Sequence, residues 1–144
     1  MKALVVHGPN LNLLGTRELS VYGPGTLEDV NGILETEAKE LGIELEIHQS
    51  SSEGEIIELL HGGIGNVVGA LLNPAAYSHT SRAIADAVRA VPYPVIEVHL
   101  SNIHAREPWR RRSVTAEAAA GIVAGFGPRS YTVALRALEG MVNA

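Results

Sequence analysis

KALVVHGPN, residues 2–10, is the stretch that decides the fold class. Its first six residues are almost continuously apolar, so both faces of a strand built from them would be buried. Such a strand is typical of a parallel sheet that is covered by helices on each side. The glycine and proline that follow favour a turn out of the sheet. We therefore predict a parallel α/β fold that begins with a strand at residues 2–7.

The rest of the chain alternates short apolar runs with amphipathic helical patterns, as parallel α/β sheets do. The patterns predict further strands at residues 43–49, 67–72, 95–100 and 121–126, and helices at 26–41, 81–90 and 128–142, with a short one around 56–60 that HGGIG ends. AAAGIVAG, residues 118–125, has no period that separates a buried strand from a helix. Thr26, Asp29 and Gly42 are the expected capping residues of the 26–41 helix.

Five βα units in 144 residues predict one domain, residues 1–144, with a flavodoxin-like architecture. This is a doubly wound, five-stranded parallel sheet in a three-layer α/β/α sandwich. Ligands bind such sheets beyond the carboxyl ends of the strands, where strand order reverses. Asn10, Asn73, His99 and Ser101 all follow or close predicted strands. Each alone could be a turn-capping or structural residue, but together they predict a site at this edge.

Composition excludes several classes of function. The chain has no cysteine, which rules out disulfides, thiolate metal sites and a cysteine nucleophile. A net charge of −5 disfavours nucleic acid as a partner, although Arg106 and Arg110 to Arg112 form a local basic cluster. The apolar runs are too short for a signal peptide or a membrane span. We expect a cytoplasmic protein with no nucleic-acid or membrane partner.

Most catalytic motifs are missing or weak. GFGPRS, residues 125–130, lacks the third glycine of a dinucleotide fingerprint, and no GxSxG motif is present. Lys2 and Lys39 are poorly placed for Schiff-base chemistry. His79, His99 and His104 leave a metal site open, but their spacing specifies no coordination geometry. We therefore expect no bound metal.

The remaining candidate chemistry is proton transfer by histidine, tyrosine, arginine and carboxylate side chains. Glu97 and His99 are two residues apart on a predicted strand, so they share a face and the carboxylate can orient the imidazole and stabilise its protonated form. This pair is a candidate general acid, with a buried structural ion pair as the alternative.

The stretch GPNLNLLGTRELSVYGPG, residues 8–25, is predicted to be a long loop. Its first part, through Asn10, is expected to form the fixed lip of the site, and its second part a mobile lid that Gly15, Gly23 and Gly25 would allow to close. It carries Arg17 and Tyr22. Tyrosine has a pKa of about 10 when unperturbed, so Tyr22 could act as a base only beside a cation such as Arg17 that stabilises the phenolate.

The segments GPNLNLLGTRE, VYG, LLNPAAYSHTS, IEVHLSN and HAREPWR together resemble the signature segments of type II 3-dehydroquinate dehydratases. The similarity extends over nearly the whole chain in the same order. It implies a shikimate-pathway lyase with a flavodoxin-like fold that converts 3-dehydroquinate to 3-dehydroshikimate without metal or organic cofactor. It also implies a homo-oligomer, a dodecamer built of trimers.

The resemblance assigns roles by position. Tyr22 would be the base, Arg17 its activating cation, Asn10 the holder of a water at the enolate oxygen, and His99 the acid that Glu97 orients. The implied substrate-binding residues are Asn73, His79, Asp86, Leu100, Ser101 and Arg110, with Asp86 supplied by a neighbouring subunit and Arg106 as a possible second cation near the phenolate.

Three departures from the family pattern affect the second helix and the subunit contacts. They are HGGIGN at residues 61–66, Ser51 with Ser52, and Arg111 with Arg112. Two other classes stay open: a noncatalytic small-ligand-binding module, and a metal-dependent hydrolase that uses His79, His99 and His104.

Overall fold

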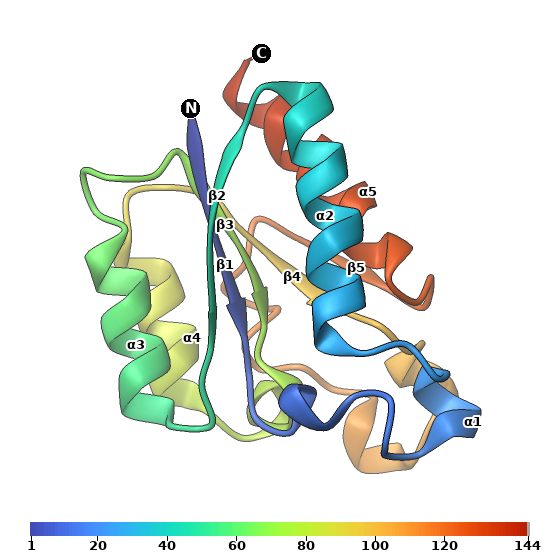
Figure 1. Cartoon of the computed structure of the whole chain (residues 1–144). Helices are drawn as coiled ribbons and strands as arrows, with labels where there is room; N and C mark the ends of the chain where they lie inside the picture. The colour runs from blue at the N-terminus through green and yellow to red at the C-terminus, as the bar shows by residue number, and fades with distance from the viewer. Residues whose placement is uncertain (144) are drawn as a thin grey trace.

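The computed structural model describes residues 1–143, which form one sheet of five parallel strands in the order β2-β1-β3-β4-β5 (Figure 1). The strands are β1 (Lys2–His7), β2 (Glu44–Gln49), β3 (Gly69–Asn73), β4 (Val95–His99) and β5 (Gly121–Ala124). This confirms the predicted doubly wound sheet, including the strand at the position where the sequence pattern also allowed a helix. Strand order reverses at β1, which has β2 on one side and β3 on the other.

Four long helices cover the sheet in two layers. Helices α2 (Leu27–Leu41) and α5 (Arg129–Val142) lie on one face, and α3 (Glu53–Gly62) and α4 (Arg82–Ala90) lie on the other (Figure 1). Strand β1 supplies both cores, because successive side chains of a strand point to opposite faces. Ala3 and Val5 pack toward α2 and α5, whereas Leu4 and Val6 pack toward α3 and α4. All four are fully buried, as the predicted three-layer sandwich requires.

The ends of helix α2 follow the expected capping residues. The Thr26 hydroxyl accepts from the Asp29 backbone N–H, and the Asp29 carboxylate accepts from the Thr26 N–H. Gly42 has a φ of 69°, and its N–H donates to the last carbonyls of the helix. Helix α3 instead continues to Gly62, two residues beyond its predicted end. The turn that follows spans residues 63–66 and contains Gly65, which has a φ of 77°.

Residues 8–25 differ from the predicted loop, because they contain two short helices. These are η1, a 3-10 helix (Leu11–Leu13), and α1 (Leu19–Tyr22). Leu11 and Leu14 are almost fully buried in the core beneath α2 and α5, which anchors the start of the segment. In the described part of the chain, no helix is both long and apolar enough to cross a bilayer.

Candidate active site

A pocket opens beyond the carboxyl ends of β1, β3 and β4, where strand order reverses. This is the edge at which doubly wound sheets bind ligands. Its walls come from the strand ends, from residues 9–22 and from the segment after β4. The lining residues are Pro9, Asn10, Leu11, Arg17, Tyr22, Asn73, Ala75, Ala76, His79, His99, Leu100, Ser101, Ile103, Arg106 and Arg110.

The floor of the pocket depends on a close approach between the ends of β1 and β3. The Gly8 N–H donates to the Asn73 carbonyl at 2.7 Å. A Cβ at position 8 would lie 2.8 Å from the Pro74 carbonyl carbon and oxygen, so only glycine fits there. Asn10 follows in the left-handed conformation, with a φ of 70°, and lies exposed at the pocket wall.

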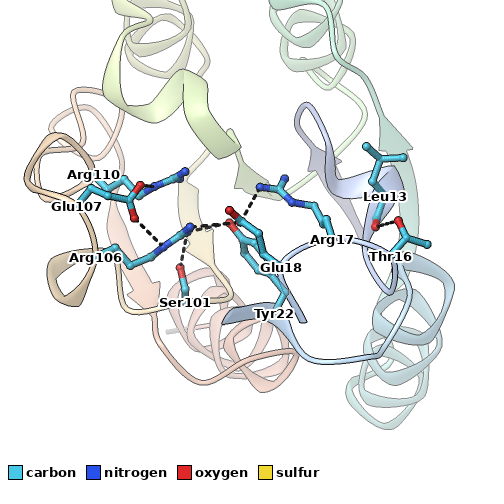
Figure 2. Close-up of polar contacts among 9 residues, drawn as sticks. All are labelled: Leu13, Thr16, Arg17, Glu18, Tyr22, Ser101, Arg106, Glu107 and Arg110. Atoms are coloured by element: carbon cyan, nitrogen blue, oxygen red, sulfur yellow. Dashed lines mark hydrogen bonds and ion pairs between the residues drawn. The ribbon is translucent and has the colours of Figure 1, made fainter. Parts of the chain in front are cut away.

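Tyr22 is the last residue of α1, and two arginines surround its phenol ring (Figure 2). Arg106 donates a hydrogen bond from Nη1 to the Tyr22 hydroxyl oxygen at 2.8 Å. The guanidinium carbon of Arg17 lies 4.8 Å from the ring centroid, and that of Arg106 lies 5.2 Å from it. Arg106, expected only as a possible second cation, is therefore the direct partner of the hydroxyl, whereas Arg17 contacts the ring.

Two glutamates accompany these arginines (Figure 2). Glu18 pairs with Arg17 at 3.0 Å and with Arg106 at 3.5 Å, so it links α1 to the segment after β4. Glu107 accepts from Arg110 Nε at 2.8 Å, and this hydrogen bond is the main cause that lowers the pKa of the Glu107 carboxyl. Sequence reasoning missed both carboxylates, although Glu107 and Arg110 have the i,i+3 spacing of a helical ion pair.

His99 and Glu97 form the hydrogen-bonded pair that their spacing on β4 predicts. The distance from His99 Nε2 to Glu97 Oε2 is 2.8 Å, and both side chains are buried. Glu97 also accepts from the hydroxyls of Ser113, at 2.6 Å, and Thr115. Since Nε2 is engaged, Nδ1 is the His99 nitrogen left to act in the pocket. Sequence reasoning missed Ser113 and Thr115, which lie on a segment without regular structure.

His79 sits at the pocket mouth as a neutral imidazole. Its Nδ1–H donates to the Arg112 carbonyl at 2.8 Å, and burial is the main cause that lowers its pKa. This tautomer leaves Nε2 as a hydrogen-bond acceptor. Trp109 packs edge-on against the imidazole, with 5.2 Å between the ring centroids. The guanidinium carbon of Arg110 lies 4.1 Å from the centroid of the indole.

The pocket gathers all but two of the predicted site residues. Glu97 is the first exception, because it acts from behind His99. Asp86 is the second, because it lies exposed on α4 and outside this pocket. Over residues 1–143, no three His, Asp or Glu side chains are grouped as they would be to hold a metal ion, so the trio His79, His99 and His104 has no geometric support.

The family model of class II dehydroquinases matches residues 1–139. The chain belongs to this family. A 3-dehydroquinate dehydratase of Desulforudis audaxviator is 53% identical over 143 residues, which are 99% of this chain and 95% of that protein. Another from Geotalea daltonii is 52% identical and covers 96% of each chain.

Solved class II dehydroquinases share the fold. The type II dehydroquinase of Butyrivibrio crossotus superposes with a TM-score of 0.93 at 40% identity, covering 100% of this chain and 98% of that one. The type II dehydroquinase of Propionibacterium acnes superposes with a TM-score of 0.92 at 40% identity, and the match covers 96% of each chain. The predicted family and its flavodoxin-like sheet are thereby confirmed.

Proposed function

We propose that the chain acts as a 3-dehydroquinate dehydratase of the shikimate pathway. It removes water from 3-dehydroquinate by anti elimination through an enolate and yields 3-dehydroshikimate. Family membership supports the activity. The observation that carries the mechanism is one pocket that holds a cation-paired tyrosine and a carboxylate-backed histidine.

Tyr22 is the proposed base. The Arg106 hydrogen bond and the Arg17 contact with the ring place two positive charges beside the phenol, and both favour the phenolate. The phenolate takes the proton from the carbon alpha to the ketone, and the bonding electrons move into the enolate. Asn10, at the pocket wall, holds a water that donates to the enolate oxygen.

His99 is the proposed acid. As an imidazolium it donates its Nε2–H to the Glu97 carboxylate and carries a second proton on Nδ1. When the enolate collapses, the carbon–oxygen bond to the leaving hydroxyl breaks and Nδ1 protonates that oxygen, so water departs. Tyr22 and His99 end the cycle as phenol and neutral imidazole, and proton exchange with solvent resets both.

The remaining pocket residues suit a polyhydroxylated carboxylate. The backbone N–H groups at Leu100 and Ser101 are the proposed partners of the substrate carboxylate. The side chains of Asn73, His79 and Arg110 are the other proposed substrate-binding groups. Each proton transfer has a side chain of this protein, so we propose that the reaction needs no metal or organic cofactor. We further propose that Asp86 completes a neighbouring site in a dodecamer of trimers, because it is exposed and does not line the pocket of its own chain.

The test is turnover of 3-dehydroquinate by the purified chain, followed as the enone absorbance of the product, with and without a chelator. We expect turnover at the same rate in both samples. An inactive protein that still binds 3-dehydroshikimate would replace this proposal with the noncatalytic module. Chelator-sensitive turnover would instead point to the metal-dependent class.

A further inference from the structure

A buried chain of hydrogen bonds connects helices α2 and α5, on one face of the sheet, with the ends of β1 and β3 at the pocket. His7 Nε2 lies 2.8 Å from the Asn31 side-chain oxygen, and His7 Nδ1 lies 2.9 Å from the Tyr131 hydroxyl. Asn73 donates from Nδ2 to the same hydroxyl at 3.0 Å. The rings of His7 and Tyr131 are buried, and neither residue lines the pocket. The proposed chemistry uses neither of them.

The Asn31 side-chain oxygen can only accept, so His7 Nε2 carries a proton and donates to it. Burial lowers the pKa of His7 to about 4, so the ring is neutral and Nδ1 carries no proton. The Tyr131 hydroxyl therefore donates to His7 Nδ1, and its oxygen accepts from Asn73 Nδ2.

The Asn73 amide is held at both ends. Its oxygen accepts from the Ala75 N–H at 3.1 Å, and its nitrogen donates to Tyr131. Ala75 has a φ of 52°, a conformation that alanine rarely adopts, so the backbone is bent at the residue that aims this N–H. Nδ2 has a second proton, and Asn73 lines the pocket, so that proton is available to a substrate oxygen.

Building on the proposed function, we infer that Tyr131 and His7 are positioning residues for substrate binding. They fix the Asn73 amide so that its nitrogen, and not its oxygen, bonds to the Tyr131 hydroxyl. The second proton of that nitrogen is then presented to a hydroxyl or carbonyl oxygen of the substrate. Without the Tyr131 hydroxyl, the amide would be free to rotate, and the substrate oxygen would then face the amide oxygen, which cannot donate a hydrogen bond. The register of the sheet supports this role, because His7 pairs directly with Asn73 across β1 and β3.

The first test is the kinetics of Tyr131→Phe, which removes the hydroxyl and keeps the ring. Loss of one oriented hydrogen bond predicts a rise in KM for 3-dehydroquinate of about tenfold, with kcat within about twofold of the original. The matched control is Tyr93→Phe, which removes another buried hydroxyl, bonded to the Leu60 carbonyl on the α3 and α4 side of the sheet. We expect the KM of the Tyr93→Phe enzyme to stay unchanged. A Tyr131→Phe enzyme with an unchanged KM would overturn the inference.

Two further variants separate positioning from general support of the fold. In an Asn73→Ala background, adding Tyr131→Phe changes KM by less than about twofold, because the group being positioned is gone. His7→Asn keeps an acceptor near the place of Nδ1 and preserves the KM, whereas His7→Leu removes it and raises KM as Tyr131→Phe does. Additive effects of the Asn73 and Tyr131 changes, or equal KM values for the two His7 variants, would contradict the inference.

A crystal structure of Tyr131→Phe tests the positioning role without any turnover, so it stays informative if the proposed reaction fails. We expect the Asn73 amide to be rotated or to occupy two orientations, judged from its neighbours. An amide that keeps its nitrogen where Tyr131 was and its oxygen on Ala75 would show that the hydroxyl does not position it.

Discussion

Tyr22 contacts two arginines, one distant in sequence and one from its own segment. The hydroxyl bonds to Arg106, 84 residues away, while Arg17 from its own segment contacts the ring. Arg106 has the smaller exposed fraction of the two, 11% against 25% of the side chain, so its charge is less screened by water. We therefore assign Arg106 the larger share in stabilising the phenolate.

Replacing Arg106 tests this assignment. Arg106→Gln should lower kcat by about a hundredfold, the typical effect of losing one charge-stabilising donor in an active site.

The matched control is Arg111→Gln, which removes an exposed arginine from the same segment but outside the pocket lining. We expect its kcat to match that of the unchanged protein. An Arg106→Gln enzyme with an unchanged kcat would return the activating role to Arg17.

At the scale of elements, regular segments were predictable and irregular ones were not. The strands and long helices follow from periodicity and caps, as Thr26 and Gly42 show for α2. The position of the pocket also follows from the sequence, because polar residues close several strands and parallel strands share one carboxyl edge. The pair of Glu97 and His99 was predictable because a strand repeats every two residues.

Contacts made by irregular segments lie beyond such reasoning. No period connects Ser113 and Thr115 to Glu97, and Glu18 reaches Arg106 only because α1 folds beside the segment after β4. The two short helices within residues 8–25 were missed for a related reason. Buried Leu11 and Leu14 hold that segment in place, and their burial depends on the tertiary fold.

At the scale of the whole molecule, buried His7 links stability to pH. Burial lowers its pKa from 6.5 to about 4, so between these values the unfolded chain binds a proton that the folded chain does not. Stability must then fall as the pH falls through this window and must be fully present above it. The shift corresponds to about 3 kcal/mol of unfolding free energy.

Urea unfolding of the protein and of His7→Asn, at one protein concentration, measures this contribution. Between pH 7 and about pH 4, the unfolding free energy of the original chain should decrease by about 3 kcal/mol more than that of the variant, which cannot titrate at this position. Parallel pH dependences for the two proteins would show that His7 is not held neutral by the fold.

If Tyr22 is the base of a 3-dehydroquinate dehydratase, removing its hydroxyl must stop catalysis and spare binding, which is measured as the kcat of Tyr22→Phe together with its affinity for 3-dehydroshikimate. Trp109, the one tryptophan of the chain, contacts His79 and Arg110 at the pocket and can report binding by fluorescence. We predict that kcat falls by about a thousandfold, as expected for loss of a general base, while the dissociation constant changes by less than about fivefold. A Tyr22→Phe enzyme that binds the product and turns over substrate at a near-normal rate would contradict the assignment.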